Sequence, residues 1–540
     1  MTDDRAQARS VSMTALLVLS VWFVGLAFLA LSPPWEGFDE TAHWSYLQQL
    51  SDTGSAPRYG LDRLSRDVDA YPGPMRYGEA PPFEATGRAT YRSYRAAGSP
   101  ANLGGPGRYA PGHTLNWQAQ HPPLYYALVV PMLRATSRMG WVDHFLGLRL
   151  FSFAMAFVGY VLGVWANVRW AKAVKSPLYL WVGPVSAAWP FLFPQFFPEF
   201  ARLGNDSLCL LLIGAAWFVL LQLLRSGASW MWAATLGVLL GAGLLTKAFF
   251  VPLGAGFVAL LLARWVYIRR VASLVDLVVT CALAAAFGGW WYVQKQVQTG
   301  SLVGADEFIR LNQAGGMARV AAQFSLLEFG RGLAAIPATF AWAGTWSLAR
   351  LPEICLIAPL GLLGVTLFDY ARTVTGRIGE AYSGVGAQLV VWAPLVLAAP
   401  MTAGLIYHNL AWMAGAAAMT PGWYFHILAG PLGLAVAIGW RRPILLSALC
   451  GATVVYTCAA WAFQLSMFSG CAAKLGLDKH YSLHGAGCFL DAHALSAITH
   501  PFMGAVCLMA GSGLGLAAAL IGLLHLRDRT AQDDLGLAPL

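Results

Sequence analysis

Long apolar runs alternate with shorter polar segments along nearly the whole chain of 540 residues. Each run holds about 20 residues, the length that an α-helix needs to cross a hydrocarbon core of about 30 Å. A transmembrane β-barrel would show alternating segments of about 10 residues instead. The pattern therefore predicts an all-α polytopic membrane protein with about 12 spans. The predicted spans are 11–31, 144–165, 178–197, 207–224, 230–246, 248–265, 272–292, 352–368, 386–406, 424–440, 443–465 and 499–524.

One further apolar segment, 121–139, is interrupted by Pro131 and Arg134. We expect it to be a partial or re-entrant segment, or to lie at the interface. The basic residues between the spans then fall on the same side as both termini, which the positive-inside rule assigns to the cytoplasm. If 121–139 crosses fully, the alternation inverts and one later run fails to span. If 121–139 does not cross fully, the long polar segments all fall on the outer side, namely 32–120, 293–351 and 466–498.

The composition agrees with a membrane protein. Hydrophobic residues make up 57% of the chain and charged residues 11%, whereas a soluble domain carries about 25% charged residues. The net charge of +9 comes from basic residues scattered between the apolar runs, with no single basic patch. We therefore expect membrane lipid around the chain and no nucleic-acid partner.

The polar segment after the first span holds the strongest candidate for chemistry. Asp39 and Glu40 are adjacent carboxylates just outside that span, and His43 follows at helical spacing, which puts it within reach on one face. This arrangement is typical of a general base with a neighbour that orients it. The alternative is that Asp39 caps a helix and Glu40 is a favourable first-turn charge. The Pro, Gly and Tyr content of 32–120 predicts short interfacial helices and turns.

Two motifs on the same predicted side add polar residues. His121 precedes two prolines at a helix start, where it is either a ligand contact or part of an interfacial belt. Arg202, Asn205 and Asp206 lie close together between two spans. Arg202 either binds an anionic ligand or pairs with Glu199, and Asp206 either faces the first carboxylates or caps the next helix.

A lysine and an aromatic stretch complete the candidate site. Lys247 lies between two spans, so it either anchors to lipid phosphate or binds the phosphate of a lipid-linked substrate. Tyr424 and His426 belong to an aromatic stretch that is either an interfacial belt or a surface on which a sugar stacks.

Cys471 and Cys488 both lie in the last predicted outer loop. A disulfide between them is one reading if that side is oxidising, and a metal pair is the alternative. The other six cysteines lie in or beside apolar runs and are expected to be structural.

The order and spacing of these motifs resemble the GT-C superfamily of integral membrane glycosyltransferases, which includes the protein O-mannosyltransferases and the lipid A aminoarabinose transferases. The resemblance covers about 11–265 and rests on Asp39-Glu40, His121-Pro122-Pro123-Leu124, Ala201 to Asp206, and Gly243 to Lys247. Within the superfamily the chain looks most like a bacterial branch of unassigned function with a Pro-x-x-Asp-Glu-x-x-His signature. That branch has a later Gly-Arg-Tyr motif, which reads Gly422-Trp423-Tyr424 here.

The resemblance implies an inverting glycosyltransferase that uses a sugar on a polyprenyl-phosphate carrier. It implies Asp39 as the general base, with Glu40 as the alternate, and Asp206 as a catalytic partner. Lys247 and Arg202 would stabilise the departing phosphate, and the other substrate contacts would be His43, His121, Asn205, Tyr424 and His426. The acceptor would be a glycan, lipid or protein hydroxyl at the periplasmic or outer face of a bacterial inner membrane. A divalent cation, Mg²⁺ or Mn²⁺, is neither required nor ruled out.

The resemblance also divides the chain into a GT-C-like catalytic core, 1–265, and a variable C-terminal region, 266–540. Three competing interpretations remain open. A glycan polymerase or ligase would carry key arginines in a large late outer loop. A transporter of a lipid-linked substrate would show charged or broken helices near the midplane. A non-catalytic scaffold would keep a degenerate GT-C core.

Overall fold

The fold is taken from a computed structural model of the whole chain. The structure describes residues 2–73, 103–176, 179–225, 230–345, 351, 353–376, 384–415, 421–439, 443–469, 472–475, 480–483 and 495–534. The candidate disulfide partners Cys471 and Cys488 lie outside the described residues, so their pairing stays a prediction.

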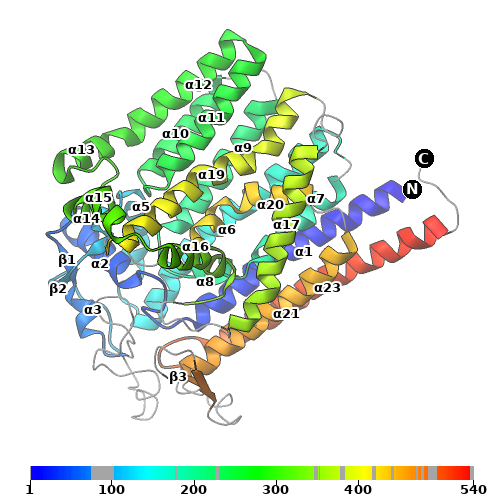
Figure 1. Cartoon of the computed structure of the whole chain (residues 1–540). Helices are drawn as coiled ribbons and strands as arrows, with labels where there is room; N and C mark the ends of the chain where they lie inside the picture. The colour runs from blue at the N-terminus through cyan, green and yellow to red at the C-terminus, as the bar shows by residue number, and fades with distance from the viewer. Residues whose placement is uncertain are drawn as a thin grey trace.

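Every predicted span coincides with helical structure, which confirms the all-α membrane architecture (Figure 1). Within the described residues, nine helical segments are long and apolar enough to cross a membrane. The helices that match the predicted spans are α1 (Thr2–Leu31), α6 (Trp141–Ala173), α7 (Tyr179–Leu192), α9 (Asp206–Arg225), α10 (Trp230–Leu244), α11 (Phe250–Ile268), α12 (Val271–Ala284) with η2 (Ala285–Gly289) and α13 (Trp290–Thr299), α17 (Ile357–Gly376), α19 (Val385–Met413), η4 (Gly422–Leu428) with α20 (Ala429–Gly439), α21 (Pro443–Phe468), and α23 (Pro501–Asp534).

The interrupted segment after His121 forms only a short helix. This helix, α5 (Leu124–Ala135), contains Pro131. At 1.5 Å per residue it is about 18 Å long, too short for a core of about 30 Å. The prediction of one partial segment is therefore confirmed.

The first long polar segment folds against the ends of the spans. Helix α2 (Glu40–Thr53) packs on α5, and two strands pair antiparallel in the register Arg63 with Leu115. The other described elements here are β1 (Arg63–Ser65), α3 (Arg66–Ala70), β2 (Pro111–Leu115) and η1 (Trp117–Gln120). The predicted interfacial helices of this segment are thus confirmed, with a small two-stranded sheet between them.

The second long polar segment, 293–351, is also largely helical. It contains α14 (Asp306–Gln313), α15 (Gly316–Gln323) and α16 (Leu326–Ala341), which pack against α19. Met317, Val320, Phe324 and Leu327 recur at helical spacing in the sequence, but they do not share one helical face. Ser325 caps a new helix by accepting from the Glu328 N–H, and of these four side chains only Val320 is buried. Other short elements are η3 (Glu353–Leu356), β3 (Ala472–Leu475) and β4 (His480–Leu483).

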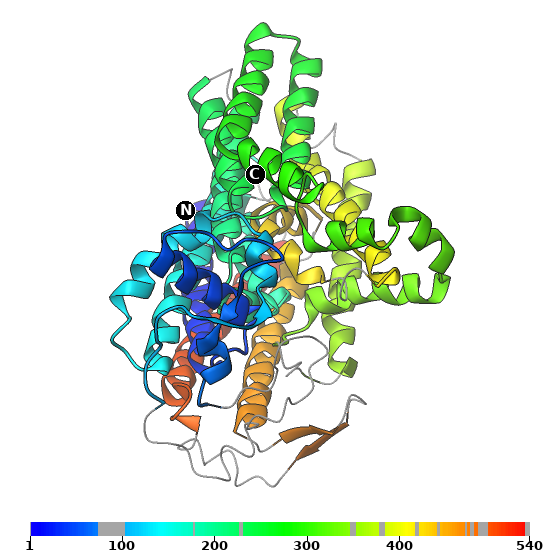
Figure 2. The ribbon, with the colours of Figure 1, turned by 90° about the vertical axis from the view of Figure 1, so that its left-hand side faces the viewer.

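The helices form a tilted bundle with two distinct ends. α1, α21 and α23 run side by side, and the start of α1 lies on the same side of the bundle as the end of α23 (Figure 1). The described parts of both long polar segments, with α2, α3 and α14 to α16, gather at the opposite end. Figure 2 shows the α10–α12 helices extending away from the remainder of the bundle. The described polar segments and the two ends of the described chain therefore lie at opposite ends of the bundle.

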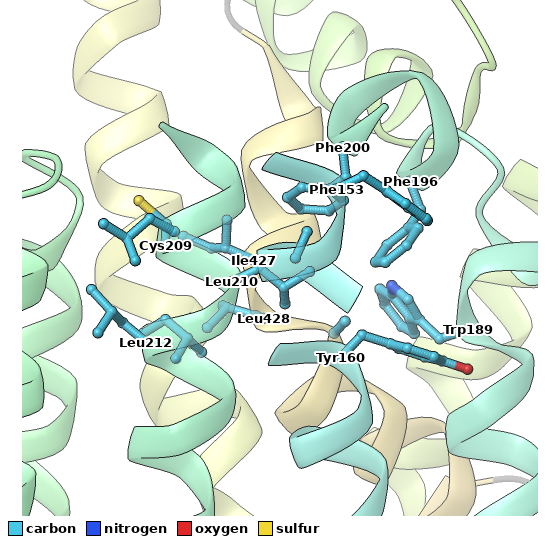
Figure 3. Close-up of a cluster of buried hydrophobic side chains, with 14 of the residues drawn as sticks. Phe153, Tyr160, Trp189, Phe196, Phe200, Cys209, Leu210, Leu212, Ile427 and Leu428 are labelled. Carbon is cyan, nitrogen blue, oxygen red and sulfur yellow. The ribbon is translucent and has the colours of Figure 1, made fainter. Parts of the chain in front are cut away.

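A dense apolar core lies directly beneath the second end. Aromatic and aliphatic side chains of α6, α7, α8 (Phe196–Phe200), α9 and η4 interlock there (Figure 3). α6 and α9 approach each other closely, since a Cβ on Gly159 would come within 2.3 Å of the Leu210 carbonyl oxygen. Small residues allow such close approach in membrane bundles. This core fixes the start of α9 and the start of η4, which carry Asp206 and Tyr424.

Candidate active site

One large cavity opens at the end of the bundle that holds the polar segments. Its volume is about 1050 Å³. Six of the predicted polar residues line it together, although they come from four different segments of the chain: Asp39, His43, His121, Arg202, Asp206 and Lys247. The wall also includes residues beyond 265, such as Trp342 and Tyr424, so the cavity draws on both predicted regions of the chain.

The cavity continues from these polar residues along two apolar membrane helices. On α11 the lining residues are Val251, Pro252 and Ala255, and on α19 they include Met401 and Gly404. Both helices are among the candidate spans, and they pack against each other. One cavity therefore joins a charged region to an apolar wall built from membrane helices.

Asp39 projects into the cavity from a strained turn. Both Trp35 and Asp39 adopt the left-handed backbone conformation, with φ of 72° and 61°, which is uncommon outside glycine and is often found at functional sites. Asp39 precedes α2, but its side chain makes no helix-capping hydrogen bond. Its Oδ1 instead accepts from Trp117 Nε1 at 2.8 Å. The simple capping interpretation therefore does not fit Asp39.

The protonation of Asp39 is set by opposing effects. Burial raises the pKa of its carboxyl above the ordinary value of 3.8, and the Trp117 hydrogen bond and the positive charges of Arg202 and Lys247 act against that rise. A carboxylate with a raised pKa holds a proton more readily than a solvated one. This is the property that a general base needs near neutral pH.

Glu40 points away from the cavity, so the structure does not support it as an alternate base. Its carboxylate is buried and forms a two-pronged ion pair with Arg149 of α6, with Arg149 Nε at 2.7 Å from Oε1. It also accepts from the backbone N–H groups of Leu203 and Gly37. Arg149 in turn donates to the carbonyls of Ser32 and Pro33. Glu40 therefore fixes the turn that presents Asp39.

Asp206 lies between two cations. It accepts from Lys247 Nζ at 2.8 and 2.9 Å and from Arg202 Nη2 at 2.8 Å. Arg202 also pairs with Glu199, whose pKa is raised by burial, and donates to the Phe38 carbonyl next to Asp39. Arg202 therefore pairs with Glu199, as the structural interpretation predicts, and it also lines the cavity where an anionic ligand could contact it.

Two aromatic rings flank the ammonium group of Lys247. Its Nζ is 4.5 Å from the ring centre of Phe249 and 4.7 Å from that of Tyr424. An ammonium has three N–H donors, and two of them go to Asp206. The third is available on the cavity wall for an anionic group.

Two parallel imidazoles stand beside this cluster. The rings of His43 and His121 are 6.5 Å apart with an interplanar angle of 9°. Burial lowers the pKa of His43 well below 6.5 and that of His121 to about 3, so both rings are neutral at pH 7. His43 Nδ1 lies 2.9 Å from Tyr126 Oη, which leaves Nε2 for a ligand. The His43 imidazole makes no hydrogen bond to the Asp39 or Glu40 carboxylate within the described residues, contrary to the spacing argument.

Two predicted substrate contacts lie off the cavity wall. Asn205 is buried and donates to the Thr246 carbonyl, which ties the start of α9 to the turn before α11. His426 is buried against Phe340, and its Nε2 lies 2.9 Å from that residue's carbonyl oxygen. Neither side chain lines the cavity, so both fit a structural role. Tyr424, in contrast, lines it.

The sequence analysis missed several residues of the site. Trp117 and Glu307 both line the cavity, and neither belongs to a motif that the pattern singled out. Arg149 could have been found from one signal, since a charge inside an apolar run is costly unless it is paired. The same signal marks Arg264 and Asp276, which form a buried ion pair at 2.7 Å between α11 and α12.

No metal site is evident in the described part of the chain. It contains no group of three or more His, Cys, Asp or Glu side chains placed to hold a metal ion. Both oxygens of Asp206 already face Lys247 or Arg202. A divalent cation therefore finds no ready set of protein ligands among these residues.

Comparisons with known proteins give only a distant likeness. No family model and no curated protein matches the chain. Two solved structures of ArnT from Cupriavidus metallidurans are similar to it in fold. The one bound to undecaprenyl phosphate has 12% identity and a TM-score of 0.41 and covers 97% of this chain and 79% of that chain. The apo structure has 13% identity and a TM-score of 0.41 and covers 96% and 78%.

A likeness this distant says nothing about activity. The function has to be argued from the side chains of the cavity.

Proposed function

We propose that the chain is a membrane glycosyltransferase that moves a sugar from a polyprenyl-phosphate carrier to an acceptor hydroxyl at the outer face of the membrane. The observation that carries this proposal is the single cavity that joins Asp39, Lys247 and Arg202 to an apolar wall on α11 and α19. A lipid-linked sugar has the same division, with a polar head and a long apolar chain. Binding sites generally match their ligands in this way.

The donor would lie with its prenyl chain along α11 and α19 and its phosphate at Lys247. The third N–H of Lys247 supplies a charge-assisted hydrogen bond to a phosphate oxygen. Trp423 stands where the resembling branch has an arginine, so a cation is missing at that position. Arg310, from the segment 293–351, also lines the cavity and supplies a further positive charge near the donor.

The chemistry follows from the position of Asp39. Asp39 accepts the proton of the acceptor hydroxyl while that oxygen forms a bond to the anomeric carbon. The bond between the anomeric carbon and the phosphate oxygen breaks, and its electron pair leaves with the polyprenyl phosphate. Lys247 and Arg202 stabilise the charge that grows on this leaving group. Attack from the side opposite the phosphate inverts the anomeric configuration.

Other residues of the cavity hold these groups in place. Trp117 fixes one oxygen of Asp39, which leaves the other for the acceptor. The neutral imidazoles of His43 and His121 serve as hydrogen-bond partners without adding charge. Phe38 stacks on Trp423 with ring centres 4.4 Å apart, directly beside Asp39, and such rings suit the apolar face of a sugar-bearing acceptor.

The test compares cells that carry the wild-type chain with cells that carry Asp39→Asn. The amide keeps the shape of the carboxyl but cannot take the proton. We expect the variant to accumulate the sugar-bearing polyprenyl phosphate and to lose a sugar from an envelope glycan, lipid or protein. Equal amounts of lipid-linked sugar and an unchanged envelope in both strains would refute the proposal and favour a scaffold.

A further inference from the structure

Most charged side chains on the cavity wall are ion-paired. Lys247 and Arg202 pair with Asp206, and Arg310 pairs with Asp306 at 2.6 Å. Two carboxylates have no ion-pair partner among the described residues, namely Asp39 and Glu307. The proposed mechanism assigns a task to Asp39 and leaves none for Glu307.

Glu307 is held at the polar part of the cavity by its neighbour in sequence. The Asp306 backbone N–H donates to Gln120 Oε1, and Tyr59 Oη donates to the Asp306 carboxylate. Gln120 immediately precedes His121, which lines the cavity beside Lys247. The hydrogen bonds of Asp306 therefore hold Glu307 close to the imidazoles of His43 and His121.

The surroundings of Glu307 do not satisfy its charge. Burial raises the pKa of its carboxyl, and its own backbone N–H supplies the hydrogen bond that acts against this. The charge of Asp306 raises the pKa further, and the attraction to Lys247 is the smallest of these effects. A carboxylate has two oxygens with about four acceptor positions. Because Glu307 lines the cavity, the positions that its own N–H leaves free are open to a ligand.

We propose that Glu307 is the sugar-recognition residue of this site and accepts N–H or O–H donors of the sugar carried by the polyprenyl phosphate. This inference rests on the proposed function. Two kinds of sugar could supply these donors. One carries a pair of hydroxyl groups that face Glu307, and the other carries an ammonium group. The phosphate is bound elsewhere, at Lys247, so Glu307 distinguishes the sugar and not the carrier.

A structural interpretation competes with this one. Asp306 and Glu307 occupy the first turn of α14, where acidic residues favour the helix dipole. That role would make Glu307 matter for α14 but not for the sugar. Glu328 is a matched control, because it is the first-turn glutamate of α16 and pairs with Arg331 away from this cavity.

The experiment measures binding of three probes to the full chain purified in detergent. The probes are undecaprenyl phosphate without sugar, undecaprenyl-phosphate glucose, and undecaprenyl-phosphate 2-amino-2-deoxyglucose. The variants are Glu307→Gln and Glu328→Gln. We expect Glu307→Gln to bind the bare carrier like the wild type and to bind a sugar-bearing carrier about tenfold more weakly, as loss of a charge-assisted hydrogen bond predicts. Glu328→Gln should bind all three like the wild type.

The sugar source follows from the pattern of losses. Loss for the amino sugar alone identifies an ammonium partner, because only that sugar carries a positive charge that the neutral amide no longer complements. Loss for both sugars identifies hydroxyl recognition. Equal weakening of the bare and sugar-bearing carriers by Glu307→Gln, or no gain from either sugar in the wild type, would overturn the inference but would not contradict the proposed function. Failure of the wild type to bind undecaprenyl phosphate would instead contradict the proposed function itself.

Discussion

Asp39 and Glu40 are adjacent in sequence, but the structure predicts opposite effects when each is neutralised. Glu40→Gln removes the negative charge that faces Arg149, and both side chains of this pair are at most 2% exposed. Removing one partner of a buried ion pair leaves an uncompensated charge and costs about 3–5 kcal/mol of unfolding free energy. Glu40→Gln is therefore expected to be strongly destabilised.

Asp39→Asn should behave differently. The pKa of Asp39 is raised in the folded state by burial, so the contribution of this group to stability falls as the pH rises through the range between its unfolded and folded pKa values. At neutral pH the ionised carboxylate lowers the stability, and a neutral amide of the same shape removes that effect. Asp39→Asn should thus be inactive and at least as stable as the wild type.

The assay is equilibrium unfolding of both variants in detergent at pH 7, together with the level of lipid-linked sugar in cells. A double variant, Glu40→Gln with Arg149→Met, is the control, because it removes both buried charges and should recover part of the lost stability. A fully stable but inactive Glu40→Gln would refute the reasoning, since Glu40 would then be the base and Asp39 the structural residue.

Three further predictions concern the cavity. Lys247→Met should raise the pKa of Asp39 further, because the charge of Lys247 lowers that pKa. The acidic limb of the profile of kcat/KM against pH should therefore move to higher pH. An acidic limb at the same pH as in the wild type would argue against Asp39 as the titrating base. Trp423→Ala should weaken acceptor binding by about 1 kcal/mol, as loss of an aromatic stack predicts, with little effect on donor binding in the same titration. Removal of divalent cations with EDTA should change turnover by less than about twofold, since Lys247 and Arg202 already pair with both oxygens of Asp206 and supply positive charge for the phosphate. Restoration of a lost activity by Mg²⁺ or Mn²⁺ would contradict this.

The fold was largely predictable because apolar run length alone identifies membrane helices. The twelve runs and the weak segment after His121 all became helices, although α5, α7 and α10, with 12, 14 and 15 residues, are shorter than a full span. The break between α15 and α16 was not predictable from periodicity. The capping hydrogen bond of Ser325 interrupts a pattern that reads as continuous in sequence.

The candidate site was predictable where a motif carries its own chemistry. Asp39, Arg202, Asp206 and Lys247 meet in one cavity, although up to about 200 positions separate them in sequence. Sequence spacing could not decide between Asp39 and Glu40, because the left-handed turn at Asp39 sends the two side chains in different directions. Glu307 was invisible for another reason, since α14 reaches the cavity only through tertiary packing.

The most direct test of lipid-linked sugar transfer is native mass spectrometry of the purified chain, with two tryptophan variants. Gly404 lines the cavity and Gly254 does not, and a Cβ at either position meets no atom within 4 Å, so both variants should fold. We predict a co-purifying polyprenyl phosphate in the wild type and in Gly254→Trp, and its loss in Gly404→Trp. Bulk phospholipid alone, in equal amounts in all three proteins, would contradict the account.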